Sequence, residues 1–264
     1  MGTQKGLIKL VGNIGGVSFY NSDGKCLARM AGGATKERIQ NDPSFVRTRE
    51  NNKEFGGSAK VGKALRTALS GVLQTMAGRN LTGQLTKLFK AINLKSTGTR
   101  GQRPFVLSDN KEMISGKDLD DRLSLTSIFS APFTVEANAD RSEVTFSIPA
   151  FTPGNLIDAP SGATHFKLVG AVGLVSDYTL NDETGSYEPK EPTQNALGVV
   201  VGSTVRSLTS NSTAVNVTAT MPNGIVPTDA VIVVACLGIE FYQEVGGTHY
   251  ILAQGNTMKI TNVF

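Results

Sequence analysis

The chain has 264 residues, of which 39% are hydrophobic and 18% charged, enough apolar material for one large domain or two small ones. Its formal net charge is +4, it contains two cysteines, and it has neither a long apolar run nor an apolar N-terminal stretch. These features argue against a transmembrane helix, a secretory signal peptide and a disulfide scaffold. We therefore expect a protein that is cytoplasmic at synthesis and whose fold depends on its hydrophobic core.

Residues 5–31 predict a small antiparallel β-meander. Short apolar runs alternate with turn signals there, and the first of them, at residues 7–10, predicts the first strand. The pair Asp23-Gly24 is typical of a two-residue hairpin turn, because both positions tolerate positive φ. A meander of this size buries little surface, so it needs cover from the rest of the chain or from another subunit.

A helical zone follows the meander. Asp42 before Pro43 predicts a helix start, since the carboxylate caps the helix and proline lacks only an N–H that this position leaves unbonded. Apolar residues at helical spacing predict a helix over 58–76, stopped by Gly78, and a further helix capped by Thr82. The two helices form an αα-hairpin whose polar side is basic.

Residues 96–103 are rich in Ser, Thr, Gly and Arg and predict a linker. The fold class that we predict is α+β: an N-terminal β-meander and basic helical hairpin in residues 1–103, followed by an acidic antiparallel β-sandwich, Greek-key or Ig-like, in residues 104–264. Residues 177–195 predict an exposed excursion, and residues 244–247 predict the tip of the last long hairpin. The segments that predict strands are residues 125–137, 142–149, 163–176, 197–206, 213–220, 229–242, 248–254 and 258–263.

Charge is distributed unevenly along the chain. Residues 1–103 hold 18 Lys+Arg and 5 Asp+Glu, a net of +13, whereas residues 104–264 hold 8 and 17, a net of −9. Such polarity indicates a polyanion as the partner of the basic half, or the acidic half of a neighbouring copy. The alternative is two solvated faces that bind nothing. The residues that we expect to contact a partner or nucleic acid are Lys60, Lys63, Arg66, Lys87, Lys90, Arg100 and Arg103.

The sequence offers no recognisable catalytic or cofactor-binding pattern. Residues 57–64 have the Gly-x-x-x-x-Gly-Lys spacing of a phosphate-binding loop, but Ala64 replaces the hydroxyl residue and no buried strand precedes it. His165 and His249 lie outside any metal-ligand spacing, and we expect each to be a partly buried or edge residue that makes one hydrogen bond. We therefore predict no enzyme activity, no cofactor and no metal.

Residues 5–20 read Lys-Gly-Leu-Ile-Lys-Leu-Val-Gly-Asn-Ile-Gly-Gly-Val-Ser-Phe-Tyr. With further stretches over most of the chain, this segment resembles a family of uncharacterised proteins from Bacteroidota. The resemblance implies a lineage but no activity, cofactor or catalytic residue. The further stretches are residues 27–29, 41–51, 54–56, 148–151, 163–167 and 237–245.

These patterns favour a non-enzymatic structural protein that assembles with copies of itself into a filament, a shell or a virion-like particle. Basic-to-acidic head-to-tail contacts, and addition of an N-terminal strand to a neighbour's sheet edge, would join the copies. The alternative is a sequence-independent nucleic-acid-binding or packaging protein, whose affinity falls steeply with salt. Base stacking is poorly supported, because Phe89 is the only aromatic residue between residues 56 and 104.

Overall fold

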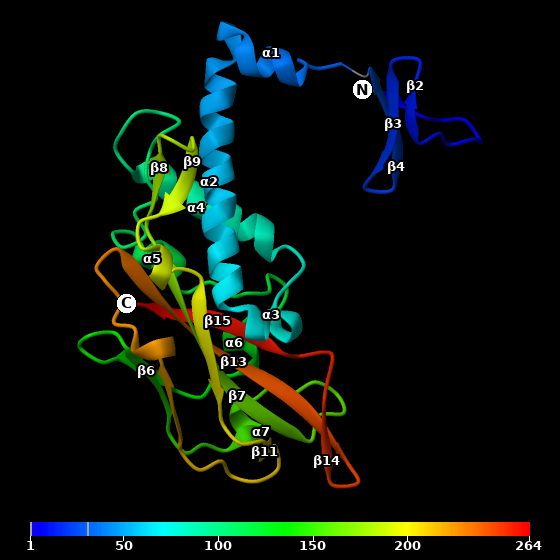
Figure 1. The fold of residues 1–264 in the computed structure, drawn as a ribbon. Coiled ribbons are helices and arrows are strands. Elements are labelled where there is room, and N and C mark those ends of the chain that lie inside the picture. The colour runs from blue at the N-terminus through cyan, green and yellow to red at the C-terminus, as the bar shows by residue number, and fades with distance from the viewer. Residues whose placement is uncertain (1, 31) are drawn as a thin grey trace. The chain divides into compact units, whose positions relative to one another are not determined.

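A computed structural model describes residues 2–30 and 32–264 and divides the chain into two units (Figure 1). Unit 1 comprises Met1–Arg49 and unit 2 comprises Glu50–Phe264. The division falls after residue 49, whereas the change in composition placed the predicted boundary after residue 103. The difference arises because the helices after residue 50 share a hydrophobic core with the sheets that follow them.

Unit 1 contains a four-stranded antiparallel sheet in the order β1-β4-β3-β2. Asp23 and Gly24 both have positive φ, 49° and 74°, and join β3 to β4, which confirms the predicted two-residue turn. Residues 7–10 do not form the predicted strand. Instead the Gln4 side chain closes a loop by bonding the N–H and the carbonyl oxygen of Leu10, at 2.8 and 3.1 Å. The elements are β1 (Gly2–Thr3), β2 (Gly12–Ile14), β3 (Val17–Ser22), β4 (Lys25–Met30), α1 (Lys36–Asn41) and the 3-10 helix η1 (Pro43–Phe45).

Asp42 and Pro43 start a helix as the sequence predicts, but the helical zone begins earlier, with the unpredicted helix α1. The Asp42 carboxylate accepts a hydrogen bond from the backbone N–H two residues on, at 2.9 Å, and η1 runs directly into the long helix α2. The helix predicted over 58–76 begins earlier and is interrupted at Leu69, and the next helix is preceded by Asn80 in place of Thr82 as its capping position. Among the described residues, no helix is both long and apolar enough to cross a membrane. The helices are α2 (Val46–Ala68), α3 (Ser70–Met76) and α4 (Leu81–Lys95).

The rest of unit 2 is antiparallel β-structure, as predicted. A large sheet has the order β10-β7-β13-β14, with β11 also paired to β7 and β15 to β13; a smaller sheet has the order β12-β6-β5. The large-sheet strands are β7 (His165–Ser176), β10 (Leu197–Gly202), β11 (Arg206–Ser207), β13 (Val231–Val245), β14 (Thr248–Ile251) and β15 (Thr257–Val263). The small-sheet strands are β5 (Thr134–Ala137), β6 (Glu143–Ile148) and β12 (Val215–Thr220).

Two β-predictions need correction. Residues 125–128 form a helical turn where a strand was expected, and the excursion at 177–195 contains a hairpin of its own, whose side chains Tyr178 and Tyr187 are buried. The hairpin tip predicted at residues 244–247 is confirmed by the β13–β14 pairing. The remaining elements are α5 (Lys111–Ile114), α6 (Leu125–Ile128), α7 (Pro153–Leu156), β8 (Tyr178–Asn181), β9 (Ser186–Pro189), η2 (Pro192–Gln194) and η3 (Pro222–Gly224).

The large sheet is covered on both faces. One core cluster joins α2, α3 and α4 to one face of β7, β13 and β15, and a second joins the other face of β7 and β13 to β5, β6 and β12. Figure 1 shows β7 and β13 running side by side through this unit. Residues 231–239 of β13 are all buried, and they read as an almost unbroken apolar run, as strands buried on both faces do.

Two glycines allow the helical layer to approach the sheet. Gly173 of β7 and Gly198 of β10 are paired in register, and both face Ala68 at the end of α2. A Cβ added at Gly173 would lie 2.9 Å from Ala68 Cβ, and one added at Gly198 would lie 1.8 Å from the Ala68 carbonyl oxygen. Side chains at these two positions would clash with Ala68 and push the end of α2 away from the sheet. The glycine pair therefore sets how closely α2 approaches the sheet.

Gly57 of α2 provides a test of this packing. A Cβ there would lie 2.6 Å from Tyr187 Cδ2 and 2.7 Å from Phe105 Cε2, whereas one at Gly56 meets nothing within 4 Å. We expect Gly57→Ala to lower the free energy of unfolding by about 1–3 kcal/mol, because the two rings must shift. Gly56→Ala, the control, should raise it by about 0.5–1 kcal/mol through helix propensity alone. Urea denaturation measures both changes, and equal effects would contradict the packing.

Candidate functional site

The seven basic residues that were expected to contact a partner lie in three different environments within unit 2. Two are bound by a buried carboxylate, Lys60 and Arg66 are partly engaged in other contacts, and three are exposed without a side-chain hydrogen bond or an ion pair. On α2 lie Lys60, Lys63 and Arg66; on α4 lie Lys87 and Lys90; Arg100 and Arg103 follow α4.

Lys90 and Arg103 are bound by Glu54 of α2, which is 1% exposed. Its carboxylate accepts hydrogen bonds from Arg103 Nε and Nη2, at 2.8 and 2.7 Å. It also accepts from Lys90 Nζ and, at 2.8 Å, from the Gly101 N–H. Both cationic groups therefore neutralise a charge inside unit 2, and neither is available to a polyanion without leaving that charge unpaired.

Burial and hydrogen bonding act on Glu54 in opposite directions. Desolvation raises the pKa of its carboxyl group, but the bonds from Arg103, Lys90 and Gly101 outweigh desolvation and lower the pKa to about 2. The bond to Glu54 also raises the pKa of Arg103. Because Gly101 donates to Glu54, residues 96–103, which were predicted to be a linker, are anchored within unit 2.

Lys60 is held by hydrogen bonds within unit 2, and Arg66 is partly shielded from solvent. Lys60 Nζ donates to Ser186 Oγ at 2.6 Å and to the Tyr187 carbonyl oxygen at 3.1 Å, both on β9. Arg66 is half-buried, and its Nε finds no hydrogen-bond partner among the described residues. The exposed members of the predicted set whose side chains form neither an ion pair nor a hydrogen bond with any residue the structure describes are Lys63, Lys87 and Arg100.

The charge asymmetry between the two parts of the sequence does not coincide with the division into two structural units. Residues 50–103 hold 10 Lys+Arg and 2 Asp+Glu, and they pack against the acidic residues 104–264, which hold 8 and 17, so unit 2 as a whole holds 18 and 19. Unit 1 holds the remaining 8 Lys+Arg and 3 Asp+Glu. Most of the opposite charge therefore lies within one unit, and the net positive charge of the chain resides in unit 1.

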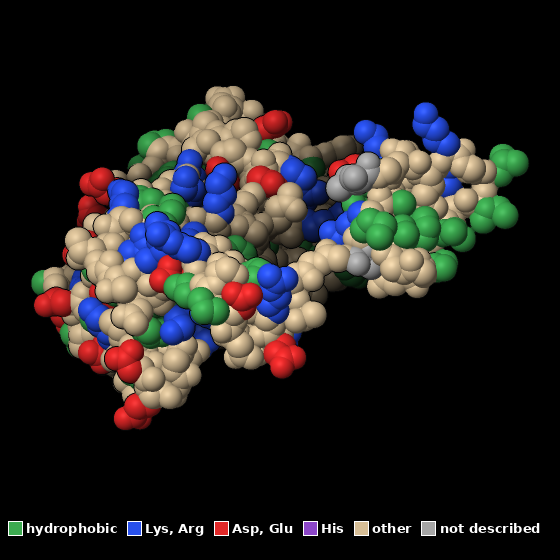
Figure 2. Space-filling view, turned by 90° about the horizontal axis from the view of Figure 1, so that it is seen from above, with side chains coloured by type: hydrophobic (Ala, Val, Ile, Leu, Met, Phe, Trp, Pro, Cys, Tyr) green, Lys and Arg blue, Asp and Glu red, His purple; other side chains and the backbone are tan. Residues whose placement is uncertain are grey.

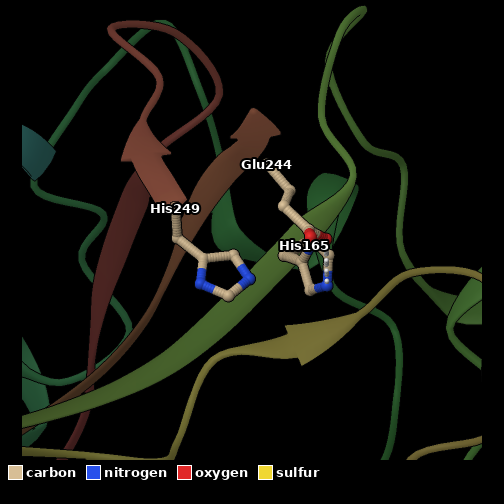
Figure 3. A group of neighbouring side chains, drawn as sticks. All are labelled: His165, Glu244 and His249. Carbon is tan, nitrogen blue, oxygen red and sulfur yellow. Dashed lines mark ion pairs between the residues drawn. The ribbon is translucent and has the colours of Figure 1, made fainter. Parts of the chain in front are cut away.

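A second group of side chains gathers at one end of the large sheet, where the chain's two histidines meet a carboxylate (Figure 3). His165 of β7 pairs with Tyr242 of β13, and Glu244 of β13 pairs with His249 of β14. Residues two apart on a strand share a face, so His165, Glu244 and His249 all project from the same side of the sheet. This is the side that α2, α3 and α4 cover farther along β7 and β13.

The three side chains are close enough to share one ligand. His165 Nε2 lies 3.5 Å from Glu244 Oε2, and the two imidazole rings meet edge to face with centroids 4.5 Å apart. One ligand atom from each residue lies within 4.8 Å of the other two. The His165 side chain is 17% exposed and that of Glu244 is 43% exposed, so the group is partly shielded and reachable from solvent.

Thr164 orients both His165 and Glu244. Its Oγ1 accepts a hydrogen bond from the Glu244 N–H at 2.8 Å, faces the Tyr242 carbonyl oxygen at 3.4 Å and lies 2.9 Å from His165 Nδ1. Thr164 Oγ1 and His165 Nδ1 share one hydrogen bond, whose direction depends on the imidazole tautomer. In the tautomer that carries its proton on Nδ1, the lone pair of Nε2 faces Glu244.

Part of this arrangement was accessible from the sequence. A two-residue turn at residues 246–247 pairs Val245 with Thr248 and therefore Glu244 with His249. The position of His165 follows from the pairing of β7 with β13, which are far apart in the chain and are brought together by the core. Local spacing therefore could not show that the two histidines lie side by side.

Comparison with known proteins adds neither a family nor a function. No model of a known protein family matches the sequence, and no curated protein matches it. The resemblance of residues 5–20 to a Bacteroidota family therefore stays a prediction. Function has to be argued from the geometry of the two units.

Replacing Glu54 tests whether Lys90 and Arg103 are the counter-ions of its buried carboxylate. We expect Glu54→Gln to lower the free energy of unfolding by about 3 kcal/mol at neutral pH, because two largely buried cations lose their counter-ion. The pKa of Glu54 is lowered from 4.5 to about 2, so its contribution is complete above the higher value and declines as pH falls toward the lower one. The difference between wild type and variant should shrink over this interval in urea denaturation.

Glu50→Gln, one turn earlier on α2, is the matched control. Glu50 forms no ion pair with a described residue, so its replacement should change stability little at any pH. A Glu54→Gln effect that does not vary with pH would contradict the ionised network.

Proposed function

We propose that the protein is a non-enzymatic structural protein that assembles with copies of itself into a filament, a shell or a virion-like particle. The observation that carries this proposal is the state of unit 1: none of its described residues is buried. A four-stranded sheet gains independent stability by packing a hydrophobic face against something. The unit 1 sheet has the strands for a stable fold, and no described element within unit 1 itself buries either of its faces.

Hydrophobic side chains lie on the outside of unit 1 (Figure 2). Leu7 and Ile8, in the loop that Gln4 closes, are 105% and 80% exposed. Contiguous exposed apolar surface of this kind is typical of protein interaction sites. The other large hydrophobic side chains exposed in unit 1 are Leu10, Val11, Ile14 and Met30.

The partner that we propose for this surface is a second copy of the chain, because the charges are complementary. Unit 1 holds 8 Lys+Arg and 3 Asp+Glu, and unit 2 holds 18 and 19, with its acidic residues concentrated in residues 104–264. A contact from unit 1 of one copy to the acidic sheets of the next is heterologous, so repetition produces a ring or an open polymer. Strand β10, at one end of the large-sheet order, offers an edge to which a neighbour's strand could add.

We also propose a more specific fold class for the two sheets of unit 2. We infer an Ig-like Greek-key sandwich from the strand orders β12-β6-β5 and β10-β7-β13-β15, in which successive strands cross between the two sheets. Ig-like sandwiches are common assembly modules because their edge strands remain available for pairing. This supports self-assembly without identifying the particle.

The loop of unit 1 is where assembly can be tested. We expect the double variant Leu7→Asp and Ile8→Asp to remain folded, because both side chains are exposed, and to weaken self-association at least tenfold by removing apolar contact. Sedimentation velocity over a protein concentration series measures association, and negative-stain imaging shows the product. Raising the salt concentration should weaken association of the wild type, because oppositely charged surfaces are screened.

Leu94→Asp is the matched control, since Leu94 is an exposed hydrophobic residue on α4 in the basic layer of unit 2. It should leave association unchanged. A wild-type chain that stays monomeric at low salt and high concentration would overturn the proposal, as would equal effects of the two substitutions.

A second candidate is sequence-independent binding of nucleic acid, and one observation favours it. Lys63, Lys87 and Arg100 are exposed and form no ion pair with a described residue, so their charges can meet phosphates. Lys90 and Arg103, which were expected to contribute, are bound to Glu54. The basic surface that supports this candidate is therefore smaller than the sequence predicted.

Charge reversal separates this candidate from self-assembly. Lys63→Glu with Lys87→Glu should weaken binding to duplex DNA and reduce the slope of log affinity against log salt by about 2, one per lost phosphate contact. Lys63→Arg with Lys87→Arg, the control, keeps both charges and should keep the slope. An electrophoretic mobility shift that charge reversal leaves unchanged would contradict this function.

A further inference from the structure

We infer that His165, Glu244 and His249 bind one divalent transition-metal ion, for which Zn²⁺ is the best chemical match. In this position the ion would join β7 to the β13–β14 hairpin. The inference is independent of the proposed assembly, because it concerns unit 2 alone and rests on different residues.

The ligand types favour such an ion. Two imidazole nitrogens and one carboxylate oxygen form a set that Zn²⁺ accepts with a fourth position left open. Imidazole also suits other first-row transition ions, whereas Ca²⁺ and Mg²⁺ prefer oxygen ligands throughout. The two histidines of this site are the only histidines in the chain.

The distances fit one coordination sphere. Bond lengths of about 2.0–2.2 Å place the ligand atoms of a tetrahedral Zn²⁺ about 3.3 Å apart. His165 Nε2 and Glu244 Oε2, at 3.5 Å, already have that separation. The longest separation in the group is within 4.8 Å, and His249 is exposed, so rotation of its side chain can close the remaining gap of about 1.5 Å.

The hydrogen bonding around His165 can accommodate a cation between the side chains. In the tautomer that carries its proton on Nδ1, His165 donates to Thr164 Oγ1 and directs the lone pair of Nε2 at the Glu244 carboxylate, which also has only lone pairs to offer. Two acceptors at 3.5 Å repel each other unless a positive charge lies between them. A metal ion on Nε2 supplies that charge, whereas in the other tautomer the ring N–H faces Glu244 and no metal ion is needed.

His249 distinguishes the two possibilities. An ion pair between His165 and Glu244 needs no third member, yet the His249 ring lies 4.5 Å from the His165 ring and completes a ligand triangle with Glu244. Figure 3 shows His249 reaching this position from the neighbouring strand β14. Thr164 adds the outer hydrogen bond that metal-binding histidines make through their second ring nitrogen.

The site leaves one coordination position for water or for a donor atom of another molecule. Three protein ligands on one face of a sheet occupy one side of the ion, and Glu244 and His249 are open to solvent. With β7 held to the hairpin by the ion, the β13–β14 tip should become more rigid. Zn²⁺ should therefore stabilise the folded chain.

The experiment is a Zn²⁺ titration of the full chain in competition with a chromophoric chelator. Cys26→Ser is used as the background, because Cys26 is a half-buried thiol that could take up zinc, whereas Cys236 is buried. We expect one Zn²⁺ per chain and a rise in the melting temperature with Zn²⁺. His249→Ala and Glu244→Gln should each weaken binding by about 100-fold or more, since the loss of an outer partner alone costs about 10- to 100-fold.

Thr164→Val tests the orienting hydrogen bond. It keeps the shape of the side chain and removes the hydroxyl group, so we expect about tenfold weaker Zn²⁺ binding with the stoichiometry unchanged. Co²⁺ titration of the background protein should produce visible bands of tetrahedral nitrogen and oxygen coordination without a thiolate charge-transfer band. His249→Ala should abolish these bands.

Glu183→Gln, an exposed carboxylate in the turn between β8 and β9, is the control and should bind Zn²⁺ like the background. Because His249 lies on an exposed hairpin, its replacement should leave the fold intact, which circular dichroism verifies. Absence of stoichiometric binding would overturn the inference, as would equal affinity in the background and His249→Ala proteins. Either result would leave His165 and Glu244 as an ion pair.

Discussion

Burial of β7 and β13 on both faces is the constraint on which unit 2 depends. These long neighbouring strands carry apolar side chains in both directions, so each face must be covered to keep them from water. The small sheet covers one face and helices α2, α3 and α4 cover the other. The helices can come close enough only because Gly173 and Gly198 leave space for Ala68.

This packing changes the meaning of the charge pattern. Docking of the helical layer on the sheets brings the basic residues 50–103 and the acidic residues 104–264 into one nearly neutral unit. The burial of Glu54 then requires cations, and Lys90 and Arg103 supply them. A basic segment that reads as a polyanion-binding surface is thus, in part, the set of counter-ions for the protein's own interior.

The two proposals arise from the places where the core ends. Unit 1 has a sheet with no buried residue among those described, so hydrophobic surface stays available for a second copy. At the far end of β7 and β13 the covered face becomes polar, and His165, Glu244 and His249 meet there. Both features lie outside the two hydrophobic core clusters, so their side chains are not selected for apolar packing.

Local patterns in the sequence determined most of the elements. Alternating Val144, Phe146 and Ile148 identify β6, the Asp23-Gly24 pair identifies a hairpin turn, and Asp42 marks the start of η1. These features depend on residues within a few positions of one another, because side-chain period, positive φ and capping are local properties. The resemblance to a Bacteroidota family and the function are not determined in this way.

Only the tertiary structure decided which elements meet. The docking of α2 on β7 and β10, the bond from Glu54 to Arg103 and the approach of His165 to His249 all join residues that lie far apart in the chain. The sequence predicted strands at the positions of β7 and β13, but not that both faces of these strands are buried or which layer covers each face. Such contacts depend on how the whole chain buries its apolar surface and pairs its buried charges, and a short segment does not contain that information.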